Sequence, residues 1–109
     1  MTLPHADTLA AALVGRRVCT YVGLKVRIVR VEDGAVVVSN DRGGECARVA
    51  LADVQAGLDQ LGAEGEVAVA FGALGPWATF VAAMLVEVEG VAFGDAPARV
   101  MLLGARSAG

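Results

Sequence analysis

Residues 24–39 read LKVRIVRVEDGAVVVS, and this stretch decides the fold. Before the Asp33-Gly34 pair, apolar residues alternate with Lys and Arg, and after it a run of valines follows. Both patterns are typical of strands. Asp-Gly between such runs favours a two-residue hairpin turn, because both positions of that turn need positive φ. The stretch therefore predicts a hairpin of residues 24–31 and 35–39.

Two further strands and a short helix surround the hairpin. Residues 17–21 continue the alternation of apolar and polar residues, and Gly23 separates them from the hairpin. Residues 45–50 follow a polar, glycine-containing loop and alternate again. Ahead of these strands, Asp7 is expected to cap a helix over residues 8–14.

The second half of the chain predicts helices. Leucine and valine residues spaced three or four apart place one apolar stripe on a helix that follows residue 50; they are Leu51, Val54, Leu58 and Leu61. We expect a strand at residues 66–71 and a turn at residues 72–76 after this helix.

A second helix is predicted over residues 76–89, with Pro76 at its first position, where a missing N–H has no cost. Its apolar stripe consists of Trp77, Phe80, Val81, Met84, Leu85 and Val88. Gly90 is expected to end the helix. Residues 91–93 and 99–103 then supply a final short strand or hairpin.

Hairpins followed by helices indicate an α+β fold. We expect a mostly antiparallel sheet built from the N-terminal hairpins, with two or three helices packed on one face. An alternative is an SH3-like small barrel over about residues 16–50, extended by a helix-strand-helix-strand unit. The 109 residues suit a single domain, with residues 1–6 and 105–109 expected to fray.

Residues 67–86 carry no charge and have the length of a membrane span. Glycines and Pro76 interrupt this run and acidic residues flank it, so we interpret it as a buried strand, turn and helix. The composition, rich in Ala and Val with a single Lys, is typical of a high-GC bacterial genome. No basic segment precedes the apolar run near the N-terminus, which favours a cytoplasmic protein.

The chain lacks the residue patterns of common catalytic and metal sites. His5 is the only histidine, and it lies in the segment expected to fray. Cys19 and Cys46 are expected to be buried thiols, with a disulfide between neighbouring strands as the alternative. We therefore expect no enzymatic activity, no metal and no cofactor.

The charges are sorted along the chain. Seven of the nine Lys and Arg residues lie within residues 16–48, where the net charge is +3. Residues 49–98 contain no base and carry a net charge of −7. Such asymmetry indicates that the first segment faces an anionic partner or that both segments simply form solvated surfaces.

Two functional hypotheses follow. In the first, the domain is a non-catalytic protein-interaction or self-associating module, a homodimer whose interface includes Trp77, Phe80 and Met84 of the helix over residues 76–89. In the second, it is a nucleic-acid-binding accessory protein that uses the basic hairpin face, with Tyr21 as the one aromatic beside the bases. The candidate phosphate contacts are Arg16, Arg17, Lys25, Arg27, Arg42 and Arg48. The first hypothesis is favoured here, and neither involves a membrane.

Overall fold

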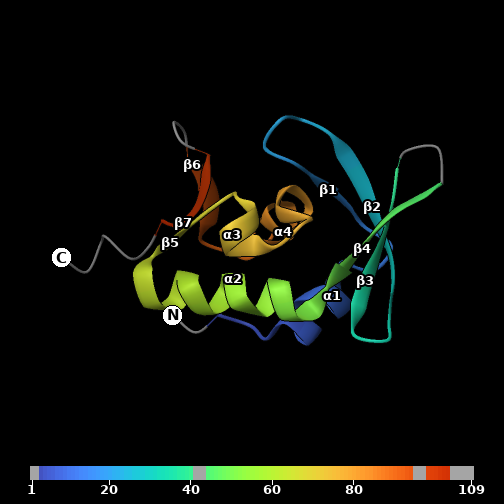
Figure 1. Cartoon of the computed structure of the whole chain (residues 1–109), viewed down its shortest axis with the longest axis horizontal. Helices are drawn as coiled ribbons and strands as arrows, with labels where there is room; N and C mark the ends of the chain where they lie inside the picture. The colour runs from blue at the N-terminus through green and yellow to red at the C-terminus, as the bar shows by residue number, and fades with distance from the viewer. Residues whose placement is uncertain (1–2, 41–43, 95–97, 104–109) are drawn as a thin grey trace.

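The computed structural model describes residues 3–40, 44–94 and 98–103. It has an α+β fold with two antiparallel sheets and helices between them, as Figure 1 shows. In chain order the elements are α1 (Ala6–Leu13), β1 (Arg17–Cys19), β2 (Lys25–Glu32), β3 (Ala35–Ser39), β4 (Glu45–Ala50), α2 (Leu51–Glu64), β5 (Glu66–Ala68), α3 (Phe71–Leu74), α4 (Ala78–Leu85), β6 (Val91–Gly94) and β7 (Arg99–Leu102).

The predicted hairpin is confirmed as β2 and β3. Asp33 and Gly34 have φ of 49° and 72°, the positive values that a tight two-residue turn needs. The four N-terminal strands pair in the order β1-β2-β3-β4, so β1 and β4 form the two edges of an open sheet. The α+β fold class is therefore confirmed, and the closed barrel considered as an alternative is not formed.

The C-terminal strands form a sheet of their own instead of extending the first one. β7 lies between β5 and β6, and Glu66 faces Met101 across the β5–β7 ladder. The reason is the length of α2, whose 14 residues carry the chain about 21 Å away from β4. The two sheets consequently lie near opposite ends of a molecule with principal extents of 44 × 27 × 23 Å (Figure 1).

The segment between β5 and β6 differs from its prediction. β5 ends at Ala68, and the expected turn contains the single helical turn α3, which ends at Gly75 with φ of 84°. α4 covers only residues 78–85 of the predicted 76–89. Gly90, also at positive φ, lies in the turn before β6 and does not end the helix.

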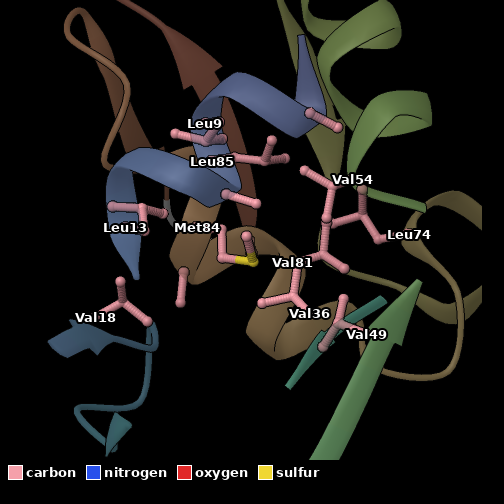
Figure 2. Packing of buried hydrophobic residues seen from close by; sticks show 14 of the residues in the cluster. Leu9, Leu13, Val18, Val36, Val49, Val54, Leu74, Val81, Met84 and Leu85 are labelled. Atoms are coloured by element: carbon pink, nitrogen blue, oxygen red, sulfur yellow. The ribbon is translucent and has the colours of Figure 1, made fainter. Parts of the chain in front are cut away.

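α4 is buried on nearly all sides, because it packs between both sheets and α2. Besides the expected apolar residues, Ala82 and Ala83 are fully buried. Figure 2 shows Val81, Met84 and Leu85 among side chains from the surrounding elements. Full burial of one Val, Leu or Met side chain contributes about 1.5–3 kcal/mol, so α4 is a main contributor to stability.

α1 begins differently from the prediction. Its N-cap is His5, which makes no side-chain cap hydrogen bond, and Asp7 lies within the first turn. The Ala6 N–H instead donates to the Gln55 Oε1 of α2 at 2.8 Å. A residue distant in sequence thus satisfies an N–H that the local sequence leaves open. Leu9 and Leu13 are buried as the helical spacing predicts (Figure 2).

Candidate binding surface on the four-stranded sheet

The four-stranded sheet has a helix-covered inner face and an opposite face, here called the outer face. Val26 and Ile28 of β2 point into the core, so Lys25 and Arg27, which alternate with them, lie on the outer face. Across the ladder, Arg17 of β1 is paired with Arg27. The outer face is therefore rich in cationic side chains.

One half of the outer face is neutralised by ion pairs. Arg30 reaches Glu32 at 3.0 Å and Glu45 at 2.8 Å, and Arg48 reaches Glu32 at 2.8 Å. The hydrogen bonds from Arg30, and secondly from Arg48, lower the pKa of Glu32 below its usual 4.5. The hydrogen bond to Glu32, and secondly that to Glu45, raise the pKa of Arg30.

Val37 lies beneath this ion-pair network. In register it stands between Arg30 and Arg48, and it is fully buried although it does not belong to the main core. The aliphatic stems of the two arginines flank it and shield it from water. Arg48 is thus occupied by a structural role, which makes it a weaker candidate for phosphate contact than the sequence indicates.

The other half of the outer face retains unneutralised charge. Within the described ranges, Lys25 and Arg27 have no ion-pair partner, and both are exposed. Lys25 faces Cys19 across the ladder, and Arg27 faces Arg17 on one side and Ser39 on the other. No acidic residue therefore stands directly across from either base.

Arg16 and Arg42 are the remaining two predicted contacts. The Arg16 Nη2 lies 3.9 Å from the Glu87 Oε1, so Arg16 faces the end of α4. Arg42 lies outside the described residues. Of the six predicted phosphate contacts, the structure brings Arg17, Lys25 and Arg27 together on the same half of the outer face.

The loop between β1 and β2, residues 20–24 and here called the tip loop, presents apolar side chains beside Lys25. Their exposed fractions are 48% for Tyr21, 67% for Val22 and 51% for Leu24. Sequence reasoning identified Tyr21 but missed Val22 and Leu24. Their signal was present, because large apolar residues in so short a loop cannot all reach a core.

The tip loop is held by its own hydrogen bonds. The Thr20 N–H donates to the Leu24 carbonyl at 2.8 Å, and the Leu24 N–H donates to the Thr20 Oγ1 at 3.1 Å. Gly23 adopts φ of 88° and donates to the Thr20 carbonyl at 2.9 Å. The Tyr21 ring of this loop also packs against Phe93 of β6, with ring centroids 6.3 Å apart and a 58° angle between the rings.

The three predicted self-association residues differ in their exposure to solvent. Met84 is fully buried within the monomer, so its inclusion in a surface patch is wrong. Trp77 stacks on Phe80, with centroids 5.6 Å apart and a 24° angle between the rings. Trp77 is 39% exposed, and Phe71 at the start of α3 is 73% exposed. The two exposed aromatic residues therefore lie in the segment before α4 and not along the helix itself.

Cys19 departs from the expectation of a buried thiol, whereas the burial of the Cys46 side chain lies outside what the structure describes. Cys19 is exposed and free. It belongs to the edge strand β1, whereas Cys46 belongs to the opposite edge strand β4. Three strand spacings separate these edges by about 14 Å, and a disulfide needs Cα atoms within about 7 Å. The alternative of a disulfide between neighbouring strands is therefore wrong.

Two searches of the described residues bear on other site classes. No group of three or more His, Cys, Asp or Glu side chains in this part of the chain gathers in a way that could hold a metal ion. None of the helices within the same residues combines the length and the apolar character needed to cross a bilayer. Comparisons of the chain with protein-family models, with curated proteins and with solved structures found no match.

Proposed function

We propose that this chain is a non-catalytic binding module whose outer face holds the phosphate backbone of a nucleic acid. The observation that carries the proposal is the pair Lys25 and Arg27, which are exposed, adjacent on one face and without an acidic partner among the described residues. Exposed Lys and Arg side chains are the usual phosphate contacts, and they give affinity without sequence preference.

The structure also limits the extent of such a contact. Arg30 and Arg48 are held by Glu32 and Glu45, so the phosphates meet only the half of the face that contains Lys25 and Arg27. With Lys25 and Arg27 alone, about two phosphates are neutralised, which for a single strand gives a salt slope of about −1.4. Affinity is therefore expected to fall roughly sevenfold between about 50 and 200 mM salt.

The acidic second half of the chain restricts the side of the molecule from which a nucleic acid can approach. Asp53, Asp59 and Glu64 lie on α2, away from the outer face, and repel a polyanion that approaches from that side. The formal net charge of −3 is thus compatible with a polyanion bound on one face only.

The test compares two variants with equal net charge. Lys25→Gln with Arg27→Gln lowers the net charge from −3 to −5, and so does Ala52→Glu with Ala56→Glu on the exposed side of α2. Binding of a fluorescent oligonucleotide is measured by anisotropy across a salt series. We expect the first variant to lose binding and salt dependence, and the second to bind nearly as the wild type does. Equal loss in both variants, or no binding by the wild type, contradicts the proposal.

Self-association is a second candidate, favoured by the exposed rings of Phe71 and Trp77 in a segment without charges. Two aromatic side chains bury about 150–250 Å² each, well below the roughly 800 Å² per partner of a stable interface. We therefore expect at most a weak dimer. Light scattering over a concentration series, with Phe71→Ser as the comparison, measures it, and a wild type that stays monomeric throughout contradicts this candidate.

A further inference from the structure

The tip loop ends immediately before Lys25, the first residue of β2. Its aromatic residue, Tyr21, is 48% exposed and lies four residues before Lys25 in sequence. A phosphate contact makes no use of an exposed aromatic ring, so a ring close to Lys25 and Arg27 favours a ligand with both charged and apolar parts. Single-stranded nucleic acid has this combination, because its phosphates are charged and its bases present flat apolar faces.

Tyr21 is positioned as a fixed stacking surface. Thr20, which is almost fully buried, holds the loop through hydrogen bonds in both directions with Leu24. Phe93 of the three-stranded sheet packs against the Tyr21 ring, so contacts from a second element restrict where the ring can lie. The ring is nevertheless half exposed, and a base that stacks on it would meet a surface that needs little further ordering.

The positions of the charges fit a strand that passes the loop. Lys25 is the first residue of β2 after the tip loop, and Arg27 lies two residues further along the same face. A strand whose base stacks on Tyr21 can place its neighbouring phosphates along this row. No acidic residue stands directly across the ladder from Lys25 or Arg27, so none there repels the phosphates.

We propose that Tyr21 stacks on a base of single-stranded nucleic acid whose adjacent phosphates contact Lys25 and Arg27. This inference rests on the proposed function and adds the strandedness of the ligand. In a duplex the bases are already stacked on each other, and extracting one costs several kcal/mol. Recognition through Tyr21 therefore selects unpaired strands over duplexes.

The experiment measures the affinity of three ligands for the full chain: a single-stranded oligonucleotide, the corresponding duplex, and a single strand of the same length made of abasic sites. We expect the single strand to bind most tightly. Tyr21→Ala should weaken single-strand binding about 5- to 150-fold, the range found for loss of one stacked base, while leaving abasic binding unchanged. Tyr21→Phe keeps the ring and should bind within about twofold of the wild type.

Val22→Ala serves as the matched control, because it removes exposed apolar surface from the same loop without removing an aromatic ring. Thermal unfolding of each variant shows whether the loss of the Phe93 contact disturbs the fold. If Tyr21→Ala is destabilised, Tyr21→Leu, which retains an apolar contact to Phe93, replaces it and should still lose single-strand binding.

The outcomes separate the two proposals. If the abasic strand and the duplex bind as tightly as the intact single strand, or if Tyr21→Ala and Val22→Ala behave alike, base stacking is refuted and phosphate binding stands. If the wild type binds none of the three ligands, phosphate binding itself is refuted. Loss of binding in Lys25→Gln with Arg27→Gln, together with a selective effect of Tyr21→Ala, supports both.

Discussion

Gly57 of α2 lies against Leu74 of α3 and Leu85 of α4, and replacing it with Ala tests how tightly the core is packed. A Cβ added there would come within 2.8 Å of the Leu74 Cδ2 and 2.9 Å of the Leu85 Cδ1. Both leucines are fully buried, so neither has open space into which it can turn. The new methyl group must therefore move at least one of them.

Two effects of opposite sign determine the free energy of unfolding. Ala stabilises a helix interior by about 1 kcal/mol relative to Gly. An extra methyl group in a well-packed core costs about 1–3 kcal/mol through shifted side chains. Because two buried leucines are affected at once, we expect the upper part of this range, so Gly57→Ala should destabilise the domain by about 1–2 kcal/mol.

Gly62 provides the matched control, since it lies in the same helix and a Cβ there meets only the Leu3 Cδ1, at 3.8 Å. Gly62→Ala should gain stability, by up to about 1 kcal/mol. Urea unfolding followed by circular dichroism gives both values. If Gly57→Ala proves as stable as Gly62→Ala, the contacts of α2 with Leu74 and Leu85 are loose and the account of this core is wrong.

Two other substitutions test local features. Gly75→Ala should lose about 1–3 kcal/mol in the same assay, because the residue has φ of 84° and its new Cβ would overlap the Asp53 carboxylate. Combining it with Asp53→Ala should recover only the part of the lost stability that comes from the overlap. Full recovery would show that the positive φ at this position does not destabilise Ala. For Glu32, the lowered pKa in the folded state means that its stabilising effect is present above the usual 4.5 and is lost as pH falls through the folded value. The urea midpoint of the wild type should therefore fall more on acidification than that of Glu32→Gln, and parallel pH profiles would contradict this role.

The N-terminal sheet could be predicted closely from the sequence because its signals are local. Asp33 and Gly34 specify the turn, and the strands at 35–39 and 45–50 have the predicted bounds. For the three-stranded sheet, the pattern at residues 91–93 and 99–103 predicts the β6–β7 hairpin but not the pairing of β7 with β5. Its β5–β7 pairing joins Glu66 to Met101, and no periodicity reports so distant a contact.

The misplaced boundaries around α4 have a different cause. Residues 67–86 carry no charge, and burial of Ala82 and Ala83 leaves the helix without a polar stripe. Hydrophobic periodicity locates elements only when one side is exposed to water, so it could not distinguish α3 from a turn here.

The candidate site was predicted in part. Lys25 and Arg27 followed from strand alternation, whereas the neutralisation of Arg30 by Glu45 depends on the register between strands and on a partner 15 residues away. Composition indicates the excess of Lys and Arg in this segment. Only the strand pairing of the four-stranded sheet shows which of these side chains form ion pairs.

The burial of Val37 beneath two arginine stems has an evolutionary consequence. This valine lies outside the main core, so the outer face rests on the sheet itself and not on the packing of α1, α2 and α4. Substitutions at Lys25 or Arg27, whose side chains are exposed on the outer face, can accumulate without disturbing that packing. Relatives of this domain could therefore share the same interior and differ in the ligand that they select.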